Sequence, residues 1–146
     1  GARLANAVQA AGDEVTLGEL QRMVSVLAPM SRLTISFRFE PGSSRPDAQS
    51  RANIVQLAEA IEAGGFDGRS LWFIGFSDGD GAAAANLRIS RARAQAVRKA
   101  VQRAAEAMAP EQVKMEIEAF GETLPMACDD SDWGRKVNRR VEVWVQ

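Results

Sequence analysis

The chain has 146 residues, of which 46% are hydrophobic and 25% charged, proportions that suit one globular domain with a single core. Its 18 basic and 19 acidic residues give a formal net charge of −1, which argues against nucleic acid as a partner because nucleic-acid binders carry a basic excess. There is no histidine, so the commonest general base and metal ligand is missing, and we expect no metal and no cofactor.

The first 31 residues are predicted to be a helical extension or the remnant of an upstream module. Thr16-Leu-Gly-Glu19 has the pattern of a capping box, which opens a short helix that Pro29 would end. The chain begins Gly-Ala-Arg-Leu, with no methionine and no signal peptide, and we expect it to be a piece of a longer protein. No apolar run approaches the ~18 residues of a transmembrane helix, so we expect no membrane span in it.

Strand and helix patterns alternate over residues 32–146, which we take as the domain. Residues 34–39 alternate apolar and polar side chains, which predicts a strand with one buried face formed by Ile35, Phe37 and Phe39. After a loop over 41–46, apolar residues recur at helical spacing until Gly64-Gly65, namely Ile54, Leu57, Ala58 and Ile61.

The second half of the domain continues this alternation. Leu71–Ile74 is a continuous apolar run, typical of a strand buried on both faces, and a long helix is predicted from Ala82 to about Met108. Alternation predicts a third strand over 113–119 and, after an irregular polar loop over 121–136, a last strand over 137–145.

The predicted order is a helix followed by β-α-β-α-β-loop-β. Two strand–helix–strand units imply parallel pairing by right-handed crossovers. The alternating strands indicate that one face of the sheet is only partly covered. We therefore predict an α/β (α+β) two-layer sandwich, with helices packed on a mixed sheet of about four strands.

The turn after the second strand, LWFIGFSDGDGAAAAN over residues 71–86, matches three known motifs. Its G-x-S-x-G resembles the nucleophile elbow of serine hydrolases, but the serine lacks a histidine base. Its G-x-G-x-x-A resembles a dinucleotide loop, but Asp78 and Asp80 would repel a pyrophosphate. As a calcium loop it lacks the third acidic ligand and the closing glutamate. The simplest alternative is a tight turn whose aspartates cap the next helix, and we expect no enzyme.

Arg93 stands near the centre of the apolar face of the predicted helix, one turn from Ile89 and Val97. A guanidinium cannot lose its charge by titration, so burying it without a partner is costly. Its stem could snorkel to the sheet edge, or the group could meet a carboxylate from the protein or from a ligand. Asp78, at the carboxyl end of the second strand, is the nearest protein candidate, and Asn86 lies on the same helix face.

If Asp78, Asn86 and Arg93 converge, they form a site suited to a zwitterionic ligand. The aspartate would take an ammonium group, and the arginine would take a carboxylate as a bidentate fork. Both charged side chains are then expected to face one open pocket.

Around these residues the sequence resembles the OmpA-like C-terminal domain, also called the OmpA/MotB or peptidoglycan-associated domain. The family's central motif runs roughly G-H-T-D-x-x-G-x-x-x-x-N-x-x-L-S-x-x-R-A-x-x-V. This chain matches it in register at Gly75, Asp78, Gly81, Asn86, Ile89-Ser90, Arg93-Ala94 and Val97. Three further stretches resemble its F-x-F-G-S, G-E-x-x-P and G-R…N-R-R-V-E motifs: 39–43, 121–125 and 134–142. The resemblance covers about residues 33–146.

The resemblance implies non-covalent binding of peptidoglycan through the meso-diaminopimelate of its stem peptide. It implies that Asp78 and Arg93 hold the ammonium and carboxylate of that residue, and that Asn86 and Arg139 complete the pocket. Asn138 and Arg140 could instead organise the last strand, with Arg140 on its exposed side. The chain would then be a periplasmic module that tethers a larger outer-membrane or other envelope protein to the cell wall.

A departure from the family motif keeps a second function open. Phe76 stands where the family usually has histidine, and Ser77 where it has threonine. The alternative function is a protein-interaction or dimerisation domain of the same fold that has lost wall binding. Its partner would be another protein, or a second copy of the chain in a homodimer.

Overall fold

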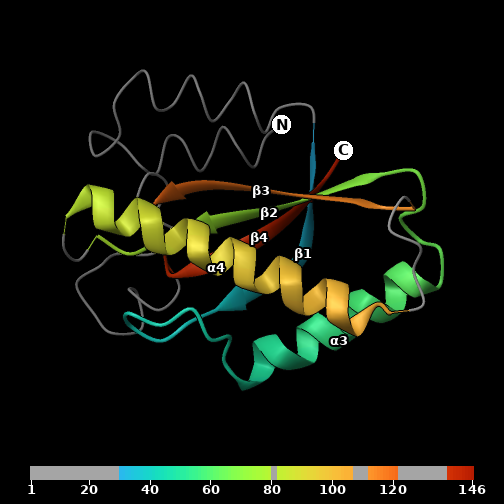
Figure 1. Cartoon of the computed structure of the whole chain (residues 1–146), viewed down its shortest axis with the longest axis horizontal. Helices are drawn as coiled ribbons and strands as arrows, with labels where there is room; N and C mark the ends of the chain where they lie inside the picture. Colours follow the sequence, from blue (N-terminus) through green and yellow to red (C-terminus); the bar gives the residue numbers. More distant parts are fainter. Residues whose placement is uncertain (1–29, 80–81, 107–111, 122–137) are drawn as a thin grey trace.

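A computed structural model of the chain describes residues 30–79, 82–106, 112–121 and 138–146. The elements follow one another as β1, α3, β2, α4, β3 and β4, at Ser31–Arg38, Ala48–Glu62, Ser70–Phe76, Ala83–Ala104, Lys114–Gly121 and Arg140–Val145 (Figure 1). The helical extension predicted for the N-terminus lies outside these residues up to position 29. Neither described helix combines the length and the apolar character that crossing a membrane requires.

The predicted two-layer α+β sandwich with a mixed four-stranded sheet is confirmed, and its strand order is β1-β4-β2-β3. Strands β2 and β3 pair in parallel, whereas β4 runs antiparallel to both of its neighbours, β1 and β2. Parallel pairing is therefore right for the second strand–helix–strand unit and wrong for the first, because β4 inserts between β1 and β2. All six residues of β4 are buried, as a central strand requires.

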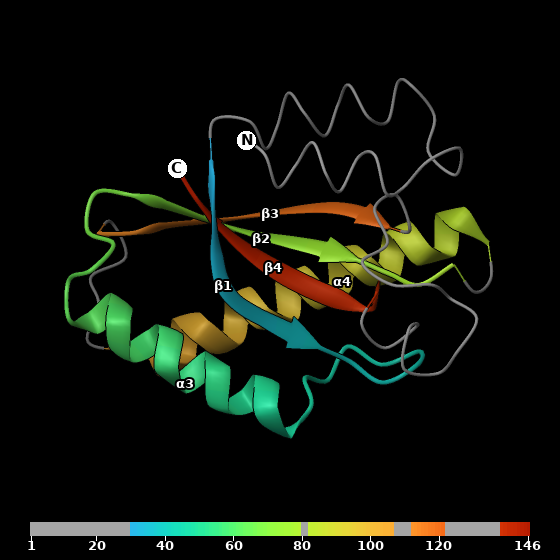
Figure 2. The same cartoon turned by 180° about the vertical axis from the view of Figure 1, so that it is seen from behind.

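Helices α3 and α4 lie on the same face of the sheet (Figures 1 and 2). Their apolar residues and those of the strands form one core, which includes Phe37, Ile54, Leu57, Ile61, Leu71, Phe73, Val97, Val101, Val141 and Val143. The apolar positions predicted for the first strand and for α3 are thus confirmed as core, except that Ile35 is only partly buried and packs against it. Burial of these side chains supplies most of the stability of the fold.

Gly75 sets how closely α4 approaches β2. A Cβ atom at this position would lie 1.9 Å from the carbonyl oxygen of Ser90, which belongs to the helix backbone. Only glycine leaves room for this approach. The contact brings the first three turns of α4 against the end of β2, where the candidate site lies.

The two helices begin differently. Asp47 caps α3, because its carboxylate accepts from the Ser50 amide at 2.8 Å. Ala82 occupies the N-cap position of α4 and makes no side-chain cap hydrogen bond. Arg139 engages one oxygen of the Asp78 carboxylate, as described below, and the hypothesis that an aspartate of the preceding turn caps this helix stays a prediction. Asp80 lies outside the described residues.

The face of the sheet turned away from α3 and α4 is more buried than the alternating strands predict. Ile74, Phe76 and Trp144 lie on it and are all buried. Arg140, which we expect on the exposed side of the last strand, is only 2% exposed. That expectation is wrong because its guanidinium lies 3.9 Å from the centre of the Phe76 ring and pairs with Glu142 at 2.7 Å.

Candidate ligand-binding site

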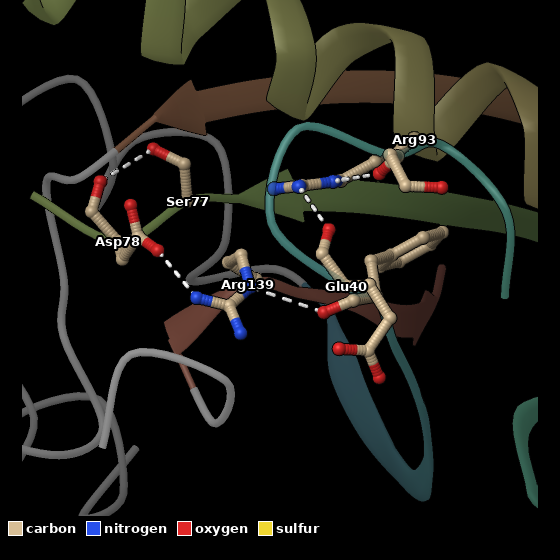
Figure 3. Close-up of polar contacts among 7 residues, drawn as sticks. Glu40, Ser77, Asp78, Arg93 and Arg139 are labelled. Atoms are coloured by element: carbon tan, nitrogen blue, oxygen red, sulfur yellow. Dashed lines mark hydrogen bonds and ion pairs between the residues drawn. The ribbon is translucent and has the colours of Figure 1, made fainter. Parts of the chain in front are cut away.

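Four segments that are distant in sequence meet at one end of the sheet (Figure 3). They are the residues after β2, the first half of α4, the loop between β1 and α3, and the residues just before β4. The charged residues that the sequence singles out, Asp78, Arg93 and Arg139, come from three of these segments. Hydrogen bonds to the fourth, through Glu40 and Ser43, complete the cluster.

Asp78 and Arg139 form a buried ion pair. Arg139 donates from Nη1 to Asp78 Oδ2 at 2.7 Å, and neither side chain is more than 10% exposed. This distance is typical of a charge-assisted hydrogen bond. Arg139 also donates from Nε to the Phe39 carbonyl at 3.0 Å, so a single guanidinium ties the end of β2 to the end of β1.

Ser77 holds the backbone that carries Asp78. Its hydroxyl donates to the Asp78 carbonyl at 3.0 Å, and its amide donates to the Gly121 carbonyl, at the end of β3, at 2.7 Å. The Gly-x-Ser-x-Gly serine therefore engages the backbone of its own turn. Its position next to Asp78 makes it a support for that carboxylate.

Arg93 is buried, at 1% exposure, so the alternative in which its stem snorkels to the sheet edge is wrong. It donates from Nε to the Ser43 carbonyl at 2.9 Å and from Nη2 to the Glu40 carbonyl at 3.2 Å. Its guanidinium also lies 5.3 Å from the centre of the Phe39 ring. The charge is thus met mainly by main-chain oxygens of the β1–α3 loop.

Among the charged groups that the structure describes around Arg93, the two that shift its pKa are Arg139 and Asp78. Burial, and then the nearby charge of Arg139, lower the pKa of Arg93 to about 10, although Asp78 opposes the shift. Arg93 therefore remains charged at neutral pH. Within the described part of the chain, the guanidiniums of Arg93 and Arg139 thus share the Asp78 carboxylate, and an added anion would relieve their repulsion.

Each of the two arginines keeps one terminal nitrogen that makes no hydrogen bond to any described residue. In Arg139 it is Nη2 and in Arg93 it is Nη1, because the other nitrogens have the partners given above. In Figure 3 the end of the Arg93 guanidinium that the loop does not engage is directed to the side where Ser77 and Asp78 lie. The arrangement can accept a carboxylate on the arginines and a cation at the aspartate.

Asn86 lies on the buried face of α4, as the sequence predicts, in the first turn of the helix. The backbone N–H of Asn86 donates to the Ala82 carbonyl at 3.0 Å. One turn later, the Ser90 hydroxyl donates to the Leu87 carbonyl at 2.8 Å and accepts from the Gly121 amide at 3.2 Å. These bonds hold the start of α4 against the end of β3, beside the turn that carries Asp78.

Sequence reasoning misses Glu40 and Ser43, whose carbonyls hold Arg93. A main-chain acceptor has no residue-type signature, so the only signal is the buried arginine itself. The turn around Gly42, which has a φ of +67°, directs both carbonyls inward, and the Ser43 amide also donates to the Glu40 carbonyl at 3.1 Å.

The fold and the buried charge cluster together define an OmpA-like domain. A comparison with family profiles matches the OmpA family over residues 38–139, which is more than half of the chain. The chain therefore belongs to the OmpA family. A comparison with curated proteins gave no match.

Solved structures agree with this assignment. The chain is similar to the peptidoglycan-associated lipoprotein from Burkholderia pseudomallei, at 26% identity and a TM-score of 0.65, over 76% of this chain and 89% of that one. It is similar to the C-terminal domain of Helicobacter pylori MotB, at 23% identity and a TM-score of 0.65, over 78% and 85%. It also shares its fold with the cell wall anchor of the T6SS from Pseudomonas aeruginosa, at 21% identity and a TM-score of 0.58, over 89% and 96%.

Proposed function

We propose that this chain is a non-enzymatic module that binds peptidoglycan non-covalently through the diaminopimelate of the stem peptide. It acts in the periplasm and tethers a larger envelope protein to the cell wall. Membership of the OmpA family supports the proposal, as does the likeness to structures described as a peptidoglycan-associated lipoprotein and a cell wall anchor.

The observation that carries the proposal is the combination of Asp78 with the unengaged nitrogens of Arg93 and Arg139. The side chain of meso-diaminopimelate ends in an ammonium and a carboxylate on one carbon atom. On this proposal the carboxylate binds the arginines, and the ammonium binds Asp78. Asn86 completes the pocket from the first turn of α4.

The phenylalanine at position 76 gives no structural reason to expect that wall binding is lost. Its ring centre lies 5.9 Å from the ring centre of Phe120 and 3.9 Å from the guanidinium carbon of Arg140. These contacts lie on the sheet face away from the helices, whereas Arg93 belongs to a helix on the opposite face. The alternative function, an interaction domain without wall binding, therefore draws no support from this substitution.

Sedimentation with purified cell walls tests the proposal directly. We expect the wild type to sediment with walls whose stem peptide contains diaminopimelate, and free meso-diaminopimelate to release it. Walls with lysine at that position lack the second carboxylate, so they should retain at least tenfold less protein, a loss of about 1.4 kcal/mol. Equal retention by both walls would contradict recognition of diaminopimelate.

A matched pair of variants connects this binding to the site. Asp78→Asn keeps the shape of the side chain and removes its charge, so it should abolish sedimentation. Asp67→Asn makes the same change at an exposed carboxylate and should sediment like the wild type. Circular dichroism checks that both variants are folded. A folded wild type that does not sediment with either wall would instead favour the interaction-domain alternative.

A further inference from the structure

Helix α4 concentrates positive charge. Its 22 residues include six basic side chains and no acidic one, although the whole chain has a formal net charge of −1. Arg93 belongs to the candidate site, and Arg98 is half-buried and directs its Nη1 to the Met115 carbonyl at 3.5 Å. The other four are exposed and are here called the basic face: Arg88, Arg91, Lys99 and Arg103.

The four cations of the basic face lie along one side of the helix. At about 100° per residue, Lys99 and Arg103 fall within about 60° of Arg88, and Arg91 lies about 60° from Arg88 in the other direction. Arg88 and Arg103 are about 22 Å apart along the helix axis. Helix α4 lies in front of the sheet in Figure 1, and no other described element lies over its outer side. The basic face is therefore a narrow strip that is open to solvent.

Few negative charges in the described part of the chain neutralise the basic face. Arg91 pairs with Glu118 at the long distance of 3.9 Å, and the other three cations form no ion pair with a described residue. Three acidic side chains at the carboxyl ends of the two described helices are exposed and pair with none of the four: Glu59, Glu62 and Glu106. Like charges one turn apart, as in Arg88 with Arg91 and Lys99 with Arg103, destabilise a helix. An anionic partner would remove this repulsion.

The basic face begins beside the candidate site. Arg88 and Arg91 stand on the exposed side of the same turns of α4 whose buried side carries Asn86 and Arg93. Glu118, the partner of Arg91, belongs to the last half of β3, which ends next to the turn that carries Asp78. A polymer held in the site can therefore continue along the exposed side of α4.

We propose that the basic face binds carboxylates of peptidoglycan stem peptides that neighbour the one held at Asp78, Arg93 and Arg139. Each stem peptide of diaminopimelate-type peptidoglycan has free carboxylates besides the one assigned to the site, so a wall strand is a repeating polyanion that complements a row of cations. Three of the four cations are arginines, whose planar fork suits a carboxylate. Once the site is filled, this second contact is intramolecular, which strengthens wall binding. The inference rests on the proposed function and adds a second region of contact to it.

Two matched triple variants of the full chain test the inference. The α4 variant removes three charges from the basic face: Arg88→Gln/Lys99→Gln/Arg103→Gln. The control variant removes the same residue types from exposed positions elsewhere: Arg51→Gln/Arg69→Gln/Lys114→Gln. Lys114 stands between Val113 and Met115, which belong to the core, so its side chain points to the sheet face away from α4. Because all six positions are exposed and glutamine is a good helix former, both variants should fold like the wild type, as circular dichroism can check.

Sedimentation with diaminopimelate-type walls is compared at ionic strengths of about 0.02 M and about 0.5 M, where the Debye length is about 20 Å and about 4 Å. At the lower ionic strength, walls should retain about tenfold less of the α4 variant than of the wild type, and about as much of the control variant. At the higher ionic strength all three proteins should be retained alike, because salt screens exposed charges. Equal retention of the α4 variant and the wild type at low ionic strength, or an equal loss in both variants, would overturn the inference.

Binding of free meso-diaminopimelate separates this inference from the proposed function. A single amino acid fills only the site, so the wild type and the α4 variant should bind it equally in an NMR titration. If the wild type does not bind it, the proposed function fails and the inference falls with it. If both proteins bind it and both sediment alike, only the inference is wrong.

Vesicles of anionic phospholipid provide the last arm of the test. Adsorption of the wild type to these vesicles that the α4 variant loses, with wall sedimentation unchanged, would assign the basic face to a membrane surface and overturn the inference. We expect neither protein to be retained by the vesicles as strongly as the wild type is by walls.

Discussion

Asp78 and Arg139 are 61 positions apart in the chain and form a 2.7 Å ion pair at the end of β2. The same arginine bonds the carbonyl of Phe39, and Arg93 bonds the carbonyls of Glu40 and Ser43 a few residues further along. The side chains proposed to bind a ligand therefore also hold three segments of the fold together. Changes at this site should alter stability and binding together, so each must be measured.

Asp78→Asn and Arg139→Gln should each destabilise the fold, by about 3 kcal/mol, because each leaves the other charge buried without its ion-pair partner. The double variant should lose less than the sum of the two, with a coupling free energy of about 2 kcal/mol. Urea unfolding of the four proteins in a double-mutant cycle measures this quantity. Strictly additive losses would show that the 2.7 Å contact contributes nothing of its own.

Arg93→Lys should lower the free energy of unfolding by about 3 kcal/mol, although it keeps the positive charge. A lysine ammonium cannot reproduce the planar fork that reaches the Ser43 and Glu40 carbonyls together. The loop between β1 and α3 should then open, and amide hydrogen exchange at Ser43 should accelerate. Arg91→Lys is the matched control, since Arg91 is largely exposed and its ion pair with Glu118, at 3.9 Å, is long. Equal effects of the two substitutions would contradict the role assigned to Arg93.

Gly75→Ala should destabilise the protein by about 3 kcal/mol, because the added methyl group would overlap the helix backbone at Ser90. Helix α4 would have to move away from β2 and would carry Asn86 and Arg93 with it. Wall sedimentation should therefore weaken even at a temperature where the variant is folded. In Gly65→Ala the added Cβ would lie 3.2 Å from its nearest neighbour, the Ala60 carbonyl oxygen. Thermal or urea unfolding should therefore show less than half the loss in free energy of unfolding that Gly75→Ala shows. A Gly75→Ala protein of unchanged stability would mean that α4 does not pack this closely.

Glu142 should make the fold sensitive to acid. Burial raises the pKa of its carboxyl group, but Arg140, Arg32 and the Trp144 hydrogen bond outweigh burial and hold it below the ordinary value of 4.5. A group whose pKa is lower in the folded state stabilises the fold above its unfolded pKa, and this contribution is lost as pH falls through the folded value. The free energy of unfolding should thus decrease as the pH is lowered below about 4.5.

The Glu142→Gln variant isolates this contribution. It should be about 3 kcal/mol less stable at pH 7, because two arginines then lack their carboxylate, and its stability should fall less steeply between pH 4.5 and pH 3. The control is Glu59→Gln, which removes an exposed carboxylate and should keep the wild-type slope. Urea unfolding at several pH values gives both curves. Parallel curves for wild type and Glu142→Gln would refute the assignment.

Most of the local structure can be predicted from sequence patterns, because periodicity reports directly on which side chains are buried. The strand at Ser31–Arg38, the helix at Ala48–Glu62 and the burial of Arg93 on the apolar face of α4 all follow from spacing. The spacing of Asp78 and Arg93 within the family motif also predicts the region of the candidate site. In each of these cases the residues that carry the signal are close to one another in the sequence.

What the patterns leave open are contacts between distant segments. Nothing near β4 in the sequence indicates that it inserts between β1 and β2, since strand order depends on which edges compete for it. The partners of Arg93 are main-chain carbonyls, which every residue possesses, so their identity emerges only when the loop is folded around Gly42. Arg140 alternates like an exposed residue, and its burial depends on Phe76 and Glu142 being held beside it by the assembled sheet.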